Sequence, residues 1–341
     1  AGYKAIVCVF LFGGQDGHDT VLPYDIDNYN RYTELRGGIL GEYDDITGGS
    51  TRDRARLNSL NPDNSAGFGG REFALPDTLA PLRDLFQSGD AAIVGNVGPL
   101  IQPITRTEFE NDLIPTPRRL FSHNDQQSTW LSSSPEGEVA GWGGRFADTM
   151  LAAGANSNDI FTAISTFGNT VFLSGQTAQQ YSLSTNGPPE VNGLRNFGGA
   201  LLGTGANSAT AVQLLEDHYR GLGPQQANLF ARDVAAVADR AFTSNDQFRA
   251  ALDAAGPLGA NFPRGFLGSQ LRAIAETINI RSALGAGRHG GLFFLTPSPG
   301  AGLRPPLMTT KSRVGSGGAP CTPATETDTW RSVPPPRVSP L

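Results

Sequence analysis

The chain is short of lysine, cysteine and long apolar runs. Among its 26 basic residues only Lys4 and Lys311 are lysine, and its net charge at pH 7 is −6. Because no stripe or cluster of basic residues occurs, nucleic acid is not an expected partner. The two cysteines, Cys8 and Cys321, make neither a disulfide framework nor a metal knuckle. No stretch approaches about 18 consecutive apolar residues, so no transmembrane segment is expected.

Glycine and proline, by contrast, are abundant. The 341 residues include 43 glycines and 24 prolines, which predicts many turns and long loops. A hydrophobic content of 38% is still sufficient for a globular core. The sequence begins at Ala1 with neither an initiator methionine nor a signal peptide, as expected of a processed or trimmed chain.

The most informative stretch is an apolar segment followed by a glycine-rich turn. Residues 6–12 are almost wholly apolar, which is typical of a strand buried on both faces in the middle of a parallel sheet. The turn that follows contains Asp16, and ligands of open α/β sheets bind just beyond the carboxyl ends of the strands. Asp16 is therefore a candidate functional residue. The alternative is that its side chain caps a turn or a helix.

The rest of the pattern predicts an α/β fold with a parallel sheet. A helix that begins at Pro76 and ends at Gly89 is followed by a second apolar strand at residues 91–97, and this βαβ order implies parallel strands. Residues 24–72 predict a helix fragment at 29–35 and a long surface excursion. Further along, we expect a helix opened by residues 141–146, short strands at 160–165 and 170–174, and mostly helix from 211 to 284.

The composition changes after Arg288. Ten of the 24 prolines fall in the last 53 residues, which have no apolar periodicity apart from residues 291–295. Such a segment buries too little surface to offset the entropy of ordering, so residues 289–341 are expected to be a disordered tail. One codon choice for residues 303–306 encodes Tyr-Asp-His-His one base later. We therefore hypothesise that the tail is a frameshift product, and a gene sequence in frame with close relatives would remove this idea.

Four motifs, in a fixed order, resemble those of a known family: GGQDGHDTVLPY, AAIVGNVGP, FSHNDQQSTW and GWGGRFAD. The family is a large group of exported bacterial proteins of unassigned function, related to the alkaline phosphatase–sulfatase superfamily. The resemblance covers about residues 4–288. It implies an alkaline-phosphatase-like domain over residues 1–288, with a parallel sheet flanked by helices. It also implies that the protein is exported on a twin-arginine signal to the periplasm or the medium. It also implies a divalent metal site (zinc, calcium or magnesium) at the strand ends.

The resemblance assigns roles to individual residues. Asp16 matches the metal ligand after the first strand, where a carboxylate beside glycine amides suits a divalent cation. Ser122 falls at the position of the nucleophile, at a helix start whose dipole favours a developing alkoxide. His123 and Asp125 are implied as further metal ligands. The supporting residues that the resemblance implies are Gly14, Gly17, Asn124 and Arg145.

Several of these residues also have a simpler structural interpretation. Ser122 and Asn124 are both common helix caps, and His18 is equally a solvated loop residue. Trp142 and Arg145 are expected to pack and to orient the site rather than to react.

The family also has a Gly-Gly-aromatic-Asp-x-His motif and later metal ligands that this sequence does not contain. Beyond Arg288 the chain has only His289 and Asp328 of these residue types, and a zinc site needs about three or four ligands. The resemblance therefore implies a metal-dependent hydrolase of phosphate or sulfate esters that is inactive in this chain. The alternatives are a non-catalytic exported binding or assembly protein with a hydrolase-like fold, and a truncated domain without its own function. The expected partner is a small ester substrate or another exported protein.

Overall fold

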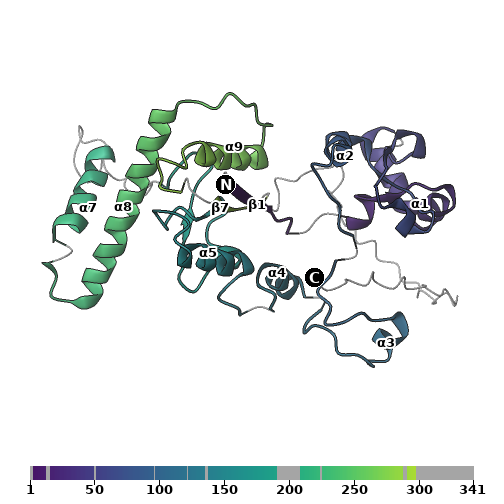
Figure 1. Cartoon of the computed structure of the whole chain (residues 1–341), viewed down its shortest axis with the longest axis horizontal. Coiled ribbons are helices and arrows are strands. Elements are labelled where there is room, and N and C mark those ends of the chain that lie inside the picture. Colours follow the sequence, from purple (N-terminus) through teal and green to yellow (C-terminus); the bar gives the residue numbers. More distant parts are fainter. Residues whose placement is uncertain are drawn as a thin grey trace, which may run out of the picture. The chain divides into compact units, whose positions relative to one another are not determined.

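The computed structural model describes residues 3–12, 16–49, 51–95, 97–120, 122–134, 137–189, 208–222, 225–286 and 290–296. In these residues the chain forms a four-stranded parallel sheet, a small antiparallel sheet and eight α-helices (Figure 1). The expected α/β class with a parallel sheet is thereby confirmed.

The parallel sheet is built around the strand that comes last in the sequence. Its strands are β1 (Lys4–Val9), β7 (Gly290–Leu295), β5 (Ala163–Ser165) and β6 (Gln180–Ser182), in the order β1-β7-β5-β6. Every residue of β7 is buried, and the strand pairs with β1 on one side and with β5 on the other. The composition break at Arg288 thus comes just before a fully buried strand of the sheet, so the α/β domain continues past the predicted boundary at residue 288. Residues 297–341 lie outside the described residues.

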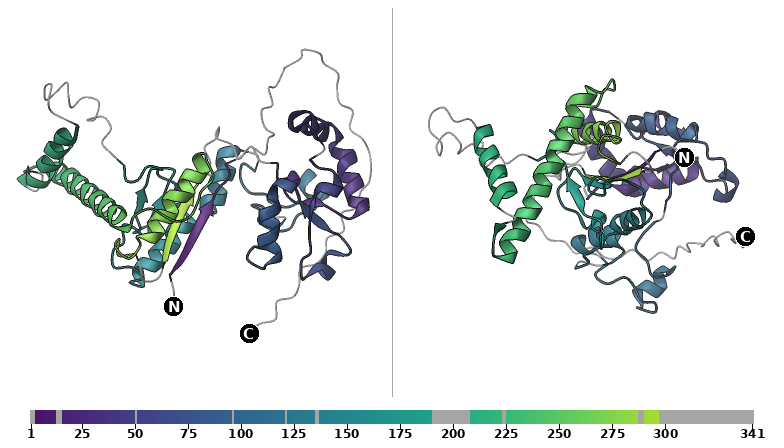
Figure 2. Two further views of the ribbon diagram at one scale, coloured as in Figure 1. Left: turned by 90° about the horizontal axis from the view of Figure 1, so that it is seen from above. Right: turned by 60° about the vertical axis from the view of Figure 1, so that its left-hand side comes forward.

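Helices cover both faces of the parallel sheet (Figure 1). Because side chains alternate along a strand, Leu292 and Phe294 of β7 face one side, and Phe293 and Leu295 face the other. The first pair packs with residues of α4 (His123–Ser132) and α5 (Trp142–Ala152). The second pair packs with residues of α8 (Leu229–Ala255) and α9 (Phe266–Asn279). Figure 2 shows the same layers from two further directions.

The first strand is shorter than predicted and lies at the edge of the sheet rather than in its middle. Three of its apolar side chains are substantially exposed: Ile6 (42%), Val7 (38%) and Val9 (46%). An apolar run predicts that a strand forms, but it does not determine how many neighbours the strand has. The predicted strand at 91–97 is also absent: the described residues 91–95 and 97 are neither helix nor strand. The predicted strand at 170–174 is instead the short 3-10 helix η5 (Val171–Leu173), because the Thr170 side chain caps the backbone N–H of Phe172.

The small antiparallel sheet packs with a long helix. Its strands are β2 (Leu22–Pro23), β4 (Phe73–Leu75) and β3 (Asn58–Leu60), and the helix is α1 (Ile26–Thr47). The predicted fragment at 29–35 covers only part of this helix, since the glycines at 37, 38 and 41 lie inside α1. The helix persists through them because Asp25 caps its start and because Tyr32 packs with Leu22, Leu57 and Ala74 in a local core.

The remaining helices carry less of the buried core. They are α2 (Ala80–Gln87), α3 (Arg106–Glu110) and α7 (Ser208–Leu222). Helices α7, α8 and α9 confirm the helical region expected between 211 and 284. The apolar stripe at the start of α8 is nevertheless exposed, with Leu229 at 68% and Phe230 at 77%. Among the described helices, none is both long enough and apolar enough to span a membrane.

Candidate functional site

The Asp16 carboxylate is occupied on both sides by groups of the chain itself. Asp16 is the N-cap of the 3-10 helix η1 (Gly17–Asp19), and one of its oxygens accepts the backbone N–H of His18 at 3.0 Å. The other oxygen, Oδ2, forms an ion pair with Arg36 and accepts the Tyr43 hydroxyl at 3.5 Å. Arg36 and Tyr43 both belong to α1, so this turn is attached to that helix. The capping role is therefore realised, and a guanidinium occupies the second oxygen.

A second, more deeply buried ion pair lies in the same turn. The Asp19 carboxylate accepts hydrogen bonds from Arg52 Nε at 2.7 Å and Nη2 at 2.5 Å. It also accepts one from the Tyr32 hydroxyl at 2.9 Å. Burial, reinforced by the Asp19 charge, raises the pKa of the Tyr32 hydroxyl, so this group stays a proton donor. The Arg52 guanidinium also lies 5.5 Å from the centre of the Tyr43 ring. Arginine side chains thus neutralise both acidic residues of the turn.

The segment around Ser122 forms the start of α4. The Ser122 hydroxyl accepts the backbone N–H of Asp125 at 3.5 Å, which is the geometry of an N-cap. The Asp125 side chain is almost fully buried and accepts Arg119 Nη1 at 3.3 Å. His123 and Asn124, in the first turn of the helix, are both exposed. Within the described residues, Asp16 and Ser122 share no hydrogen bond and engage different neighbours.

One hydrogen bond ties α4 to the segment that follows β1. The Gln127 side-chain amide donates to the Phe12 carbonyl at 3.2 Å. This contact holds α4 beside the segment that follows the first strand. Gly14, a predicted supporting residue, lies outside the described residues, whereas Gly17 is exposed and has open space around its Cα.

Arg145 and Trp142 hold α5 against its neighbours. Arg145 Nη2 donates to the carbonyls of Ser132 at 3.1 Å and Ala140 at 3.0 Å. The Trp142 ring stands edge-on to Phe172 with the ring centres 4.4 Å apart. Both side chains therefore hold α5 in place through hydrogen bonds and ring packing, and the prediction that they orient a site stays a prediction.

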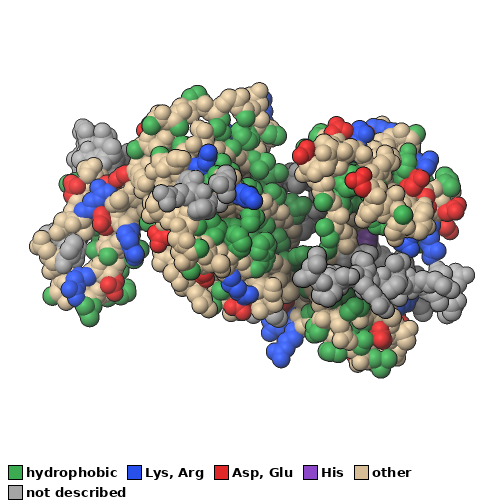
Figure 3. Space-filling model, viewed as in Figure 1, with side chains coloured by type: hydrophobic (Ala, Val, Ile, Leu, Met, Phe, Trp, Pro, Cys, Tyr) green, Lys and Arg blue, Asp and Glu red, His purple; other side chains and the backbone are tan. Residues whose placement is uncertain are grey.

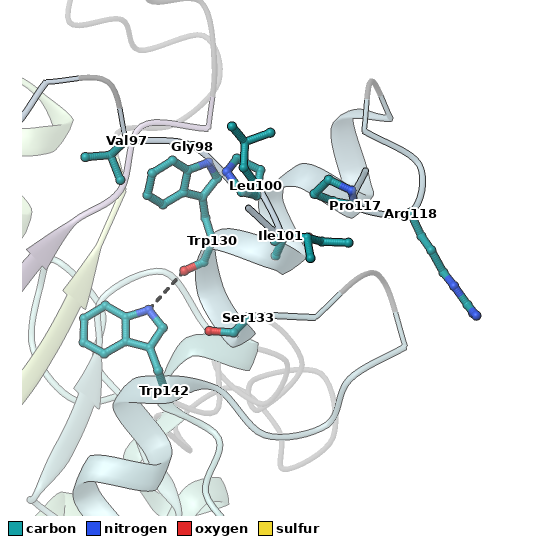
Figure 4. A pocket seen from close by; sticks show the side chains of 11 residues that line it. Val97, Gly98, Leu100, Ile101, Pro117, Arg118, Trp130, Ser133 and Trp142 are labelled. Atoms are coloured by element: carbon teal, nitrogen blue, oxygen red, sulfur yellow. Dashed lines mark hydrogen bonds between the residues drawn. The ribbon is translucent and has the colours of Figure 1, made fainter. Parts of the chain in front are cut away.

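A hollow of about 490 Å³ lies beside the two tryptophans (Figure 4). Its walls come from residues 97–101, from Pro117 and Arg118, and from α4 and α5. Trp130 and Trp142 stand one above the other and are joined by the hydrogen bond from Trp142 Nε1 to the Trp130 carbonyl, 3.0 Å long. The charged end of Arg118 extends away from the hollow (Figure 4). The space is consequently lined mainly by apolar side chains.

The predicted metal-binding residues, as they are arranged, do not fit a divalent cation. The Asp16 oxygen that would bind the metal faces the positive charge of Arg36, and a second cation there would be repelled. Asp125 is paired with Arg119. No group of three or more His, Cys, Asp or Glu side chains that could hold a metal occurs in the described part of the chain.

The residues that sequence reasoning missed are the basic and aromatic partners on α1. Tyr32, Arg36 and Tyr43 are separated by four and seven residues, a spacing that places them on one face of a helix. The signal was therefore present. The glycines at 37, 38 and 41 obscure it, because glycines so closely spaced favour a surface excursion over the second half of a helix.

Fold and site together define an α/β protein with a parallel sheet covered by helices. In the turn that contains Asp16 and Asp19, arginine side chains neutralise both carboxylates. No protein-family model, curated protein or solved structure matches the chain. The resemblance to the alkaline phosphatase–sulfatase superfamily therefore rests on the four sequence motifs alone and stays a prediction.

Proposed function

We propose that this chain is an exported, alkaline-phosphatase-like protein of the class that hydrolyses phosphate or sulfate esters with divalent metals, and that it has no turnover of its own. The observation that carries the proposal is the ion pair between Asp16 and Arg36. Asp16 is the residue that the motifs identify with the first metal ligand. In this chain a permanent cation, the Arg36 guanidinium, neutralises it instead.

Charge and ligand number both support this proposal. A divalent ion at Asp16 would have to displace a guanidinium that is itself only 18% exposed. Hard cations such as calcium and magnesium bind through several oxygen ligands, and zinc through about three or four protein ligands. The Ser122 hydroxyl, the proposed nucleophile of active relatives, is here engaged as a helix cap.

The test combines hydrolysis with thermal stability. We expect the purified chain, given zinc, magnesium or calcium at about 1 mM, to hydrolyse neither p-nitrophenyl phosphate nor p-nitrophenyl sulfate above background. The same ions should stabilise it by about 0.4 kcal/mol or less, the value for a Kd near 1 mM, whereas a Kd near 1 μM would give about 4 kcal/mol. Thermal unfolding with and without each ion measures the difference.

Two variants make the result specific to the site. Asp16→Ala and Ser122→Ala should match the unsubstituted chain in the hydrolysis assay. Ester hydrolysis that EDTA abolishes and that either variant loses would show that these residues assemble a working metal site, and the proposal would be abandoned.

A second candidate function is a non-catalytic binding or assembly protein, and the hollow beside Trp130 favours it. Trp130 is 46% exposed, and the neighbouring Leu100 and Ile101 are 51% and 62% exposed. Adjacent exposed apolar side chains around a concavity are typical of a surface that binds an apolar group of a partner.

For this candidate we expect the apolar dye 1-anilinonaphthalene-8-sulfonate to bind the folded chain at the hollow. Trp130→Ala should lower the dye fluorescence severalfold, because the ring forms one wall. Leu113→Ala, which removes a 66% exposed side chain outside the hollow, is the matched control. Equal dye signals from the two variants would exclude the hollow as the binding surface.

A further inference from the structure

In the part of the chain that the structure describes, no strand pairs with the outer edge of β1. The backbone N–H of Phe10 donates to the Leu295 carbonyl at 3.0 Å, so alternate residues 4, 6, 8 and 10 direct their backbone groups toward β7. By the same alternation, Ala5, Val7 and Val9 direct theirs away from the sheet, where the described residues offer no further strand. Figure 3 shows hydrophobic side chains gathered over this part of the molecule. Such an edge is a template for another strand.

Residues 91–95 have the complementary properties. They carry the apolar pattern of a strand, yet they are unpaired, and the side chains of Ile93 (36%) and Val94 (79%) are exposed. A local turn joins their start to the end of α2, where the N–H groups of Asp90 and Ala91 both donate to the Leu85 carbonyl, at 2.9 and 3.0 Å. Among the described residues, this segment has no strand pairing with β1.

One parallel register matches charge and apolar side chains at once. With Asp90 beside Lys4, both of them exposed, residues 91–95 lie beside residues 5–9. Ile93 then adjoins Val7, and Val94 adjoins Cys8. The backbone groups that β1 directs outward meet those of Ala92 and Val94, and the N–H of Ala91, which is already bonded to α2, is not needed. Opposite charges at the start of the pair fix the register.

We propose that two copies of this chain form a dimer in which residues 91–95 of each copy add a parallel strand to the β1 edge of the other. The exchange is reciprocal, so one two-fold axis satisfies both open edges and both unpaired segments. It covers Ile6, Val7 and Val9, whose exposure the single chain does not explain. This inference concerns assembly, and it stands independently of whether the chain hydrolyses esters.

Cysteine cross-linking tests the pairing directly. In a Cys321→Ser background, Cys8 is the only remaining thiol, and Val94→Cys introduces its neighbour in the proposed register. Neighbouring strands lie about 4.8 Å apart, a spacing that allows a disulfide. Burial raises the pKa of the Cys8 thiol, so oxidation by oxidised glutathione is done at mildly alkaline pH. We expect a covalent dimer on non-reducing gels.

The matched control is Val139→Cys in the same background. Val139 is 80% exposed, against 79% for Val94, but it lies in neither strand of the proposed pair. It should give no covalent dimer above that of the background protein. An intramolecular disulfide in Val94→Cys would show pairing within one chain, and a dimer from Cys8 alone would show β1 against β1. Either of these results overturns the proposal. So does a Val94→Cys protein that keeps both thiols free after oxidation.

Mass measurements give a second, thiol-independent reading. By light scattering after gel filtration, the unsubstituted chain should have twice its 36.0 kDa mass at micromolar concentration. Val94→Asp should be monomeric because it brings a carboxylate into an apolar strand pair, whereas Val139→Asp should remain dimeric. Both sites are exposed in the single chain, so neither change threatens folding. A monomeric unsubstituted chain, or equal masses for the two variants, would contradict the exchange.

Discussion

Replacing Gly144 by alanine is expected to destabilise the fold by about 3 kcal/mol, the upper part of the range for overpacking a core. Gly144 lies in α5 where the helix passes directly over the backbone of Ser174 and Gly175. A Cβ at this position would overlap the Ser174 carbonyl, which cannot swing away as a flexible side chain could. Helix α5 and η5 would have to separate, and Phe172 would lose part of its packing. Urea denaturation followed by circular dichroism measures the change.

The matched control for this prediction is Gly38→Ala in α1. A Cβ at Gly38 meets nothing within 4 Å, and the position lies inside a helix. Alanine is preferred over glycine in a helix interior by about 1 kcal/mol, so this variant should be more stable than the unsubstituted chain. If both substitutions change stability equally, the close approach of α5 to η5 is not what glycine provides at position 144.

Replacing Arg52 by alanine is expected to cost about 3–5 kcal/mol, because it leaves the Asp19 carboxylate buried without its counter-charge. Arg52 and Asp19 are 7% and 8% exposed, and two guanidinium nitrogens reach the carboxylate. The Tyr32 hydroxyl remains as a donor, but it is neutral and cannot replace the charge. The free energy of unfolding of the purified variant, from urea denaturation, measures the loss.

Arg56→Ala supplies the comparison for the buried pair. Arg56 reaches Asp77 at 2.7 Å, a similar distance, but the two side chains are 47% and 31% exposed. Solvent screens such a pair, so its removal should cost less than about 1 kcal/mol. Equal losses from Arg52→Ala and Arg56→Ala would mean that Asp19 finds another partner or water once Arg52 is gone.

An ester hydrolase and a binding or assembly protein would use different residues of this chain. An ester hydrolase would need Asp16 and Ser122 free to act, yet a guanidinium and a helix-capping hydrogen bond occupy them. A binding or assembly protein would instead use exposed apolar groups, and these lie at the β1 edge and beside Trp130. Exposed apolar groups are therefore what the second candidate function and the proposed dimer would both use.

Local pattern was sufficient for most helices. Gly141 before Trp142 marked the start of α5, and the apolar stripes at 229–242 and 267–278 marked α8 and α9. These signals are local because a helix makes its hydrogen bonds within itself. Ser122 as a helix cap was likewise readable, since capping depends on a few neighbouring residues.

Strand placement was not readable in the same way. Residues 6–12 and 91–97 have nearly the same apolar character, but only the first forms a strand, and residues 290–295 lie between β1 and β5 at the centre of the sheet. A strand is completed by hydrogen bonds to chain far away in the sequence, so its own residues do not specify its neighbours.

By itself the sequence determined the α/β class and the helical region from 211 to 284, and it offered helix capping as one of two interpretations of Asp16 and of Ser122. Only the tertiary structure decided which cation meets Asp16 and which strand is buried. Arg36 is 20 residues from Asp16, and Gly290 is far from its partner Lys4. Contacts of this kind depend on how α1 and the sheet pack, because long-range charge pairs and strand pairs form only when packing brings distant residues together.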